Sequence, residues 1–585
     1  MVAVTFVVHY PAVTAGYIWD DELYLHKSPL TTAPDGLYRS WFTTEELDYW
    51  PLTRTMFWLE WRIWGNNPMP YHVGNILIHA VAAVLLWRVL RWLNVNPPGA
   101  YLAGLIFAVH PVTIESVAWI AERKNVLSMA LYLLAILAYL RFHDQRCRRW
   151  YVFALLAAAA ALLAKTSVVM LPVVLLLLIG WKQGAIARRD LVRTAPFFLV
   201  SLALGLLTIW YQHQNVISGV IVRPEGLASR IASVGWVVWF YLYKIVVPMN
   251  LAMVYPRWDV DGGRVLSFVP LGLLIACFVV LGYYRRGWGR APLAALGSFV
   301  IVLAPVLGLL EMAYARYSLV ADHLQYPGMP GIIALLGGCL GAAWLRARAT
   351  GRGAVAVGLA AAAGAVAIAL GAMTWRQAQT YRNAETLWSH TIAINDHAWV
   401  AYNTRGNAYS DKHDHDRAIR DYTRAIELRP DYAEACFNRG NSYNSMGDFG
   451  RAIRDLTEAT VLNPDYAEAY NNRGNVFNEI RDFNRAVRDY SRAIEFKPDY
   501  AEVFNNRGSV YLNMRDFGRA IRDCTTAIGL KPDYGDPYNN RAIAHFHMKE
   551  YAKAWADTRR FSQLGGTPHP GFLKALSEAS GMHGN

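Results

Sequence analysis

The sequence predicts an all-α membrane protein in two parts, a bundle of about eleven membrane-spanning helices followed by a helical solenoid. Three observations predict this architecture. Long apolar runs fill the chain up to Met373, charged residues become frequent from Thr374 onward, and a proline recurs every 34 residues in the C-terminal third. The 585 residues allow several domains, and the 13% share of aromatic residues suits membrane interfaces.

The distribution of charge argues against nucleic acid as a partner, although the net charge first suggests it. A formal charge of +13 could indicate nucleic acid, but in the N-terminal half the basic residues cluster between apolar runs, at 141–149, 182–193, 285–290 and 346–352. That pattern is typical of cytoplasmic loops, so we expect no nucleic-acid partner. The five cysteines form no close pairs, which argues against a disulfide framework or a zinc site.

The membrane-spanning segments follow from the length of the apolar runs, since about 20 residues cross the ~30 Å hydrocarbon core. The candidates are 2–17, 73–93, 100–119, 125–141, 150–164, 167–181, 195–211, 268–284, 292–310, 328–345 and 353–373. With the basic clusters in the cytoplasm, the N-terminus is inside and the solenoid is outside, on the periplasmic side. We interpret 231–248 as an interfacial or re-entrant helix, because another crossing would move the basic cluster at 285–290 outside.

The first apolar segment allows two interpretations. It is short for a span, and a signal peptide cleaved after Ala15 is the alternative. We favour a first span, because cleavage would leave Trp19, Asp20 and Asp21 at a new terminus.

Polar residues gather in the loops assigned to the outer face. Asp20 and Asp21 directly follow the first span, where carboxylates are costly to desolvate. The link at 110–124 and three other outer segments add the remaining candidates: His110, Glu115, Arg123, Lys124, Arg54, Lys165, Arg316, Asp322 and His323. Their convergence on one side predicts an active site or a lipid-headgroup pocket. The alternative is that the acids are solvated and the basic residues anchor helix ends.

The C-terminal third has a 34-residue period. Pro430, Pro464, Pro498 and Pro532 are each followed by Asp and Tyr, and a glycine of the first helix recurs at the same spacing. This is the tetratricopeptide repeat (TPR) pattern. We expect a membrane domain at 1–373, a connecting helix or half repeat at 374–398, five repeats at 399–432, 433–466, 467–500, 501–534 and 535–568, and a cap or tail at 569–585.

An asparagine ladder runs through the repeats, at positions that line the groove of such arrays: Asn407, Asn438, Asn441, Asn472, Asn475, Asn506 and Asn540. An amide both donates and accepts hydrogen bonds, so the ladder predicts binding of an extended polypeptide. It resembles the asparagine ladder of the O-GlcNAc transferase repeats. The alternative is a set of solvated amides without a ligand.

Several motifs together resemble a known family. They are the acidic pair Asp20–Asp21, PLTR at 51–54, YHVGNILIH at 71–79, FAVHPVTIESVAWIAERKNVL at 107–127, the Ala164–Lys165–Thr166 junction and RYSLVADH at 316–323. With the repeats, the chain resembles the transmembrane and tetratricopeptide repeat-containing (TMTC) O-mannosyltransferases and their bacterial relatives. The resemblance extends over nearly the whole chain, and it departs at Thr166, where relatives often have Glu.

The resemblance implies a GT-C glycosyltransferase fold. Such enzymes take a sugar from a polyprenyl-phosphate carrier and pass it to an acceptor outside the cytoplasm, here a polypeptide. It also implies that the acidic pair is catalytic. The sugar is not determined.

The residue types suit that chemistry, because inverting transfer to a hydroxyl requires a base and a way to stabilise the departing phosphate. We expect Asp20 or Asp21 as the base or as the group that orients the acceptor. We expect the donor phosphate at Arg54, Arg123, Lys124, Lys165 and Arg316, supported by His110, Glu115, Asp322 and His323. No metal or other cofactor is required, although one bridged by Asp20, Asp21 and Asp322 is an alternative.

Two other functions use the same features. A degenerate membrane half could anchor the repeats as a scaffold for protein–protein assembly, or the phosphate pocket could serve a transporter or polymerase of lipid-linked sugars. The acidic pair favours the enzyme, whereas Thr166 and the short N-terminal segment favour the scaffold. Usage rich in Ala and Arg suggests a bacterial inner-membrane protein.

Overall fold

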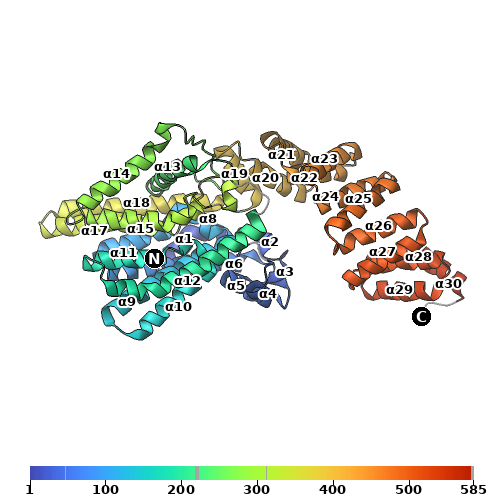
Figure 1. Ribbon diagram of the computed structural model, residues 1–585, viewed down its shortest axis with the longest axis horizontal. Coiled ribbons are helices and arrows are strands. Elements are labelled where there is room, and N and C mark those ends of the chain that lie inside the picture. Colours follow the sequence, from blue (N-terminus) through green and yellow to red (C-terminus); the bar gives the residue numbers. More distant parts are fainter. Residues whose placement is uncertain (46–47, 218–222, 311, 582–585) are drawn as a thin grey trace. The chain divides into compact units, whose positions relative to one another are not determined.

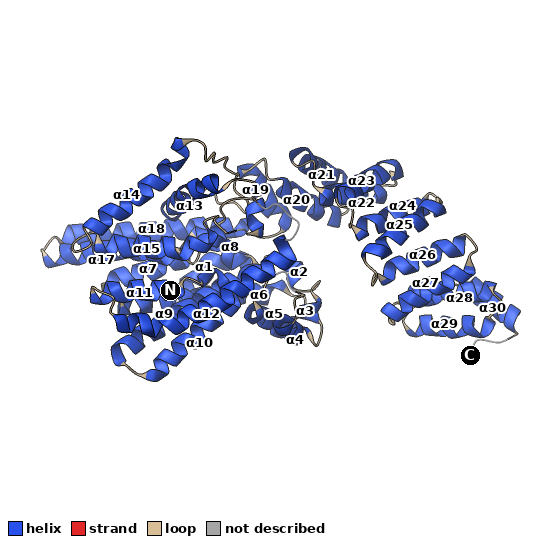
Figure 2. Ribbon diagram, in the orientation of Figure 1, coloured by secondary structure: helices blue, strands red, loops and turns tan. Residues whose placement is uncertain are grey.

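The protein is helical throughout the part of the chain that the computed structural model describes, residues 1–45, 48–217, 223–310 and 312–581 (Figures 1 and 2). No strand occurs in these ranges, which confirms the all-α prediction. The chain divides into two compact units, Met1–Ala398 and Trp399–Asn585.

The first unit contains the apolar helices. Its N-terminal half holds α1 (Val2–Val13), α2 (Asp21–Tyr24), α3 (Pro29–Thr32), α4 (Gly36–Phe42), α5 (Pro51–Trp64), α6 (Pro68–Trp92), α7 (Pro97–Val109), α8 (Ile114–Ala118), α9 (Arg123–Gln145) and α10 (Arg148–Ala164). Its C-terminal half holds α11 (Leu171–Gln183), α12 (Arg188–Gln212), α13 (Leu227–Val246), α14 (Val269–Tyr283), α15 (Arg290–Leu303), α16 (Asp322–Gln325), α17 (Met329–Ala349), α18 (Gly353–Thr380) and α19 (Ala384–Ile394).

Each of the eleven predicted spans falls on a helix of this unit. Within the described residues, seven helical segments are long and apolar enough to cross a membrane, or up to eight if the bent pair Pro97–Val109 and Pro111–Ala118 is one span. The shorter helices α1, α10 and α15 account for the other predicted crossings. A multi-pass membrane protein is therefore confirmed, while the count of eleven and the interfacial placement of α13 stay predictions.

The helical path bends by 50° after α7, where the buried 110–124 link begins. Pro111 has no backbone N–H, and His110 is extended, so the helix ends at Val109. The Val112 N–H donates to His110 Nδ1 over 3.3 Å, and the His110 Nε2 N–H donates to Ile245 O over 2.9 Å. These two bonds use both ring nitrogens, so His110 holds the link against α13.

Helix α9 lies at the centre of the bundle and α14 and α18 at its periphery. Within the apolar windows of the described spans, 72% of the one that contains α9 is buried, against 6% for both α14 and α18. Both helices expose large apolar side chains, such as Ile275 of α14 and Ile368 of α18, as expected for contact with lipid.

The connecting segment packs onto the membrane unit. Helix α18 continues to Thr380, past the expected boundary at Met373. In α19, Trp388 is fully buried and its ring lies 5.2 Å from that of Trp19, while His390 Nε2 lies 2.9 Å from Leu251 O. Because these contacts are with the first unit, this helix belongs to it.

The second unit consists of five helix pairs and a final helix: α20 (Trp399–Asp411), α21 (His415–Leu428), α22 (Ala433–Ser445), α23 (Phe449–Leu462), α24 (Ala467–Glu479), α25 (Phe483–Phe496), α26 (Ala501–Asn513), α27 (Phe517–Leu530), α28 (Gly535–His547), α29 (Tyr551–Gln563) and α30 (Pro570–Ser580). The recurrent glycine permits close pairing, since a Cβ at Gly474 would lie 2.8 Å from the Tyr490 ring. Leu576 of α30 is buried, as expected for a cap.

An Arg–Asp pair recurs in every repeat and joins its two helices. In the third, Arg473 binds Asp489 through Nε and Nη2 at 2.7 and 2.8 Å, and Nη1 reaches Thr457 of the preceding repeat at 3.0 Å. The other pairs are Arg405–Asp421, Arg439–Asp455, Arg507–Asp523 and Arg541–Asp557. The planar guanidinium thus fixes both a helix pair and the stacking of successive repeats.

Candidate functional site

The two carboxylates of the acidic pair have different surroundings. Asp21 is fully buried and accepts backbone N–H bonds from Ile18 at 3.0 Å and Ala121 at 2.7 Å, so it attaches the first loop to the 110–124 link. Asp20 accepts one bond, from the Trp119 indole N–H at 3.0 Å. Asp20 is therefore the member of the pair with free acceptor capacity towards a substrate.

Burial raises the pKa of both carboxyls. The pKa of Asp20 rises to about 6, because desolvation outweighs the attraction of Lys124. Desolvation and the neighbouring Asp20 hold the pKa of Asp21 well above its usual range. A carboxyl with a pKa near 6 can accept a proton at neutral pH, which is the property that a general base requires.

Two lysines flank one carboxylate beside the acidic pair. Glu122 binds Lys124 Nζ at 2.9 Å and Lys165 Nζ at 3.1 Å, and all three side chains are largely buried. Burial lowers the pKa of Lys165, and Glu122 opposes this effect. Two cations around one carboxylate leave a net positive charge, which can attract a phosphate. Glu122 was not among the predicted site residues, although the Glu-Arg-Lys sequence at 122–124 could have suggested it.

Arg123 and Arg54 are enclosed by the protein. Arg123 is fully buried, pairs with Glu60 and donates to Asn75 Oδ1 at 2.7 Å and Tyr71 O at 2.6 Å. Arg54 is 4% exposed and donates to Tyr24 O at 2.9 Å. Both guanidinium groups therefore hold the 17–71 segment, predicted as the first outer loop, in place, and we do not retain them as direct phosphate ligands.

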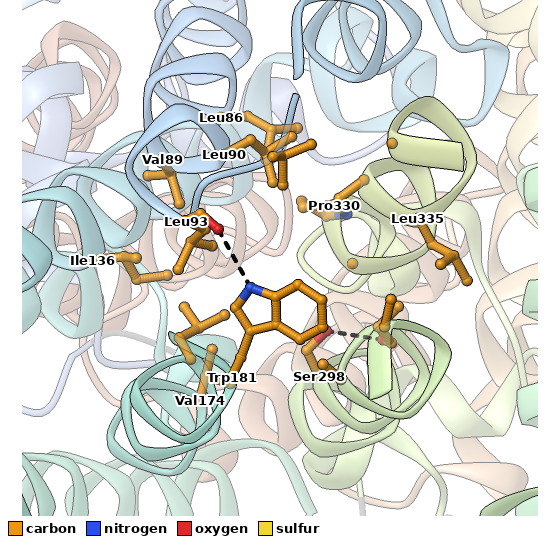
Figure 3. Close-up of a pocket in the computed structure, with 18 of the residues that line it drawn as sticks. Leu86, Val89, Leu90, Leu93, Ile136, Val174, Trp181, Ser298, Pro330 and Leu335 are labelled. Carbon is orange, nitrogen blue, oxygen red and sulfur yellow. Dashed lines mark hydrogen bonds between the residues drawn. The ribbon is translucent and has the colours of Figure 1, made fainter. Parts of the chain in front are cut away.

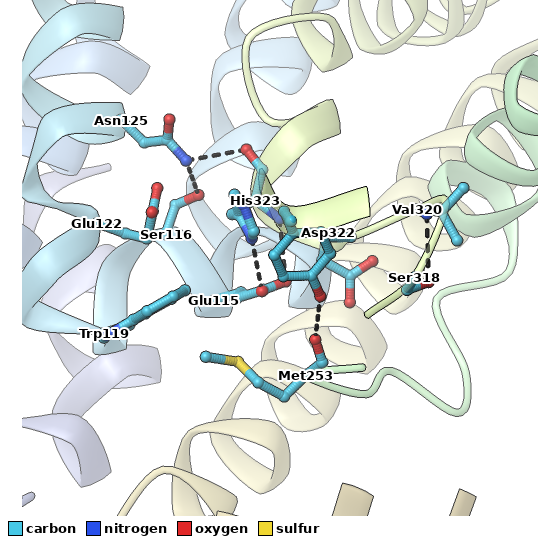
Figure 4. Close-up of polar contacts among 12 residues, drawn as sticks. Glu115, Ser116, Trp119, Glu122, Asn125, Met253, Ser318, Val320, Asp322 and His323 are labelled. Carbon is cyan, nitrogen blue, oxygen red and sulfur yellow. Dashed lines mark hydrogen bonds and ion pairs between the residues drawn. The ribbon is translucent and has the colours of Figure 1, made fainter. Parts of the chain in front are cut away.

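A second polar cluster joins the 110–124 link to the 316–323 segment, which belongs to the last predicted outer loop (Figure 4). Both oxygens of Glu115 bind His323, one to Nδ1 at 2.7 Å and one to the backbone N–H at 3.0 Å. Asp322 accepts from Tyr255 OH at 2.9 Å and Gln325 Nε2 at 3.1 Å. Desolvation and the Glu115 charge hold the pKa of Asp322 well above its usual range. Tyr255 and Gln325 were missed because only the fold brings them here.

Aromatic rings connect the two clusters. Trp19 stacks on Trp119 with ring centroids 5.2 Å apart and planes 4° apart, and the edge of Trp119 meets His323 at 5.8 Å. Trp19 has φ of +49°, which is strained for a bulky side chain and persists only where packing holds it. The backbone next to Asp20 is thus rigidly placed.

Arg316 lies apart from these buried groups. Its guanidinium is exposed, donates to Tyr317 OH at 2.5 Å and lies 4.6 Å from that ring. Tyr317 in turn meets Trp19 edge-on at 5.8 Å, so Arg316 borders the site from the solvent side. Within the described residues, no group of three or more His, Cys, Asp and Glu side chains could hold a metal ion.

The asparagine ladder forms bonds between repeats. Asn438 Nδ2 donates to Asn403 and Asn407 at 3.1 and 3.0 Å, and Asn472 Nδ2 donates to Asn441 at 2.9 Å. Asn506 and Asn540 continue the series towards Asn471, Asn475 and Asn505. The amides are therefore held in fixed orientations and remain partly exposed.

Comparisons with known proteins give a family for each part of the chain. Residues 50–211 match the family described as dolichyl-phosphate-mannose-protein mannosyltransferase. Residues 399–432 and 467–500 match a tetratricopeptide repeat family, and 440–480 and 501–534 match two further TPR families.

Among curated proteins, similar ones include Protein O-mannosyl-transferase Tmtc1 of Drosophila melanogaster, 33% identical over 149 residues, and the human proteins TMTC1, 39% over 105 residues, and TMTC3, 31% over 151 residues. The matched regions make up 24%, 18% and 24% of this chain. They cover 17%, 12% and 16% of the relatives, so the similarity spans less than a fifth of each relative's length.

Similar solved structures include the crystal structure of MamA, with a TM-score of 0.27 and 26% identity, covering 27% of this chain and 94% of that one. Another is YrrB, titled a TPR protein with an unusual peptide-binding site, with a TM-score of 0.29 and 17% identity, covering 33% and 98%. In this chain a region similar to a mannosyltransferase family thus precedes tetratricopeptide repeats, and the similar curated proteins include ones named as TMTC O-mannosyl-transferases.

Proposed function

We propose that the protein is a membrane glycosyltransferase that moves a sugar from a polyprenyl-phosphate carrier to a hydroxyl of a polypeptide. The observation that supports this most strongly is the placement of a carboxyl suited to act as a base, Asp20, beside the lysine pair around Glu122. The names of the relatives, protein O-mannosyl-transferases, favour mannose and a protein acceptor.

In this proposal the acceptor hydroxyl attacks the anomeric carbon of the sugar while the bond from that carbon to the phosphate oxygen breaks. Asp20 takes the hydroxyl proton, and the polyprenyl phosphate leaves with the bonding electrons and its added negative charge. Lys124 and Lys165 stabilise that charge. Asp21 and Arg123 act as positioning residues, because they hold the loop and the link that present these groups.

The second cluster faces the same site from the last outer loop. Glu115 fixes the orientation of His323, and Trp119 contacts both His323 and Asp20. We assign His323 and Asp322 a supporting role, in which they form part of the wall of the site next to Trp119. Arg316, exposed at the solvent side, is placed to meet a sugar phosphate as it enters.

The repeats bind the acceptor polypeptide in this proposal. The bonds of the asparagine ladder orient the amides before a ligand arrives, which lowers the entropy lost on binding. Transfer takes place on the periplasmic face, as the positive-inside rule requires, and the array lies on that side too. A reporter fused after Asn585 that proves cytoplasmic would contradict this placement.

The decisive test is reconstitution of the purified full-length chain with a series of polyprenyl-phosphate sugars and periplasmic protein, followed by mass spectrometry of the products. We expect one sugar to be transferred to Ser or Thr by the wild-type protein and none by Asp20→Asn. Retention of polypeptide binding with no transfer from any donor would instead establish the membrane-anchored scaffold.

A further inference from the structure

An apolar cavity of about 460 Å³ lies within the membrane unit, and none of the candidate site residues lines it. Its walls come from α6, α9, α11, α15 and α17, as Figure 3 shows, with Leu86, Leu90, Ile136, Val174, Trp181 and Leu335 among the lining residues. A closed hydrophobic core would fill this volume with side chains. We therefore infer that another molecule occupies the cavity.

The cavity belongs to the membrane face opposite the acidic pair. Tyr71, near the start of α6, receives the Arg123 bond next to the candidate site, whereas Leu93, just after the end of α6, lines the cavity. The two residues are 22 positions apart, which corresponds to about 33 Å of helix, close to the ~30 Å thickness of the hydrocarbon core. One end of the cavity thus lies in the leaflet far from Asp20.

The surface of the cavity is mainly apolar. The polar lining groups of three residues already have partners within the protein: Trp181 Nε1 donates to Leu93 O at 3.4 Å, Ser298 Oγ to Ala295 O at 2.9 Å, and Asn96 Nδ2 to Gly338 O at 2.9 Å. The lining is otherwise mainly aliphatic. An alkyl chain fits such a surface, and a polar ligand does not.

Positive charge stands at the far end of the cavity. Arg290 is exposed, donates to Trp181 O and lies 5.2 Å from the Trp181 ring, and its neighbour Ala291 lines the cavity. Arg91, also exposed, follows the lining residue Leu90. An anionic headgroup at this position would meet the Arg290 guanidinium while its chain entered the cavity.

Packed side chains separate the cavity from the lysine pair. Along α9, Val126 and Met129 lie between Lys124 and the first lining residue of that helix, and both are at most 1% exposed. Along the next segment, Val168 and Leu171 lie between Lys165 and Val174 and are equally buried. A carrier chain anchored by its phosphate at the lysines would be blocked from the cavity by this layer.

We propose that the cavity holds one acyl chain of an anionic phospholipid from the leaflet opposite the acidic pair, with the lipid phosphate against Arg290. The lipid is a resident of the bundle and is distinct from the sugar donor. It fills the space between α15, α17 and the central helices, so its binding favours the folded state of the membrane unit.

Native mass spectrometry of the full-length protein from mild detergent tests the proposal. We expect one anionic phospholipid to stay bound after delipidation, and phosphatidylglycerol to be retained in preference to phosphatidylcholine from nanodiscs of either composition. Ala294→Phe with Ala334→Phe fills the cavity and should abolish retention. Arg290→Gln should lower affinity roughly tenfold, as expected for loss of a charged contact.

Two matched variants act as controls. Ala362, changed to Phe, lies on the exposed side of α18, and Arg286, changed to Gln, is exposed in the turn that precedes α15 and Arg290. Both variants should retain the lipid. Added phosphatidylglycerol should also raise the melting temperature of the delipidated wild type and not of the filled variant. Retention of a polyprenyl phosphate in place of a phospholipid, no retained lipid at all, or equal losses in the controls would overturn the proposal.

Discussion

The two units of the molecule use buried charge in different ways. In the repeats, each Arg–Asp pair joins residues 16 positions apart, and the same contact recurs five times in the described chain. In the membrane unit, the Asp21 bond to Ala121 spans 100 positions and the Glu115 bond to His323 spans 208. Charged pairs in the repeats therefore maintain a regular stack, whereas charged pairs in the bundle bring distant segments of the chain together in one site.

The largest expected effect is the loss of transfer on changing Asp20. Asp20→Asn keeps the size of the side chain and removes the base, so the rate of transfer should fall about 10²- to 10⁴-fold. Transfer of labelled sugar by the reconstituted protein measures it. Glu22→Gln, at an exposed neighbouring acid paired with Lys27, should leave the rate unchanged. Equal rates for Asp20→Asn and wild type would remove the proposed mechanism.

The second-largest effect on the rate of transfer is expected from the lysine pair, Lys124 and Lys165. Lys165→Met removes one cation from Glu122, and we expect the rate to fall roughly 100-fold because the leaving phosphate loses a charged donor. Lys182→Met is the matched control, since Lys182 pairs with Asp144 in a similar way near the other end of α11. A comparable loss from the control would show that the effect is structural.

Removing one of the repeated Arg–Asp pairs should lower the stability of the repeats without a direct effect on catalysis. Arg473→Ala leaves Asp489 largely buried and unpaired and frees Thr457, so the unfolding free energy of the isolated unit 399–585 should drop by about 2 to 3 kcal/mol. Chemical denaturation followed by circular dichroism measures it. Arg488→Ala, an exposed arginine of the same repeat, should change it by less than about 0.5 kcal/mol.

The pH dependence of transfer should report the pKa of Asp20. Because burial raises this pKa to about 6 and the base acts when ionised, the rate should rise with pH up to about 6 and level off above it. Below that value, each pH unit should cost about tenfold. Lys124→Met removes a charge that lowers the pKa, so its profile should shift to higher pH. An unshifted profile would show that the charge of Lys124 does not affect the pKa of Asp20.

The smallest effect is expected from the asparagine ladder. Asn438→Ala with Asn472→Ala removes two amides, and the KM for a polypeptide acceptor should rise several-fold while kcat is kept, since each hydrogen bond contributes about 1 kcal/mol. Asn484→Ala, an exposed amide on the second helix of its repeat, should have no effect. An unchanged KM would favour a purely structural role for the ladder.

The sequence by itself determined the architecture. Apolar length predicted helices that cross a membrane, and the 34-residue period predicted the repeats, because both depend on contacts that are local or repeat along the chain. The chain also identified the segments of the candidate site, since the acidic pair and the 110–124 link stand out in composition.

Only the tertiary structure decided what each charged residue does. The sequence grouped Arg54 and Arg123 with Lys124 and Lys165 as equivalent cations, but the fold encloses the two arginines with partners of their own and leaves the lysines around Glu122. The fold likewise gives Asp20 and Asp21 different hydrogen-bond partners. The physical reason is that desolvation and pairing depend on neighbours brought from far along the chain, and no local pattern encodes them.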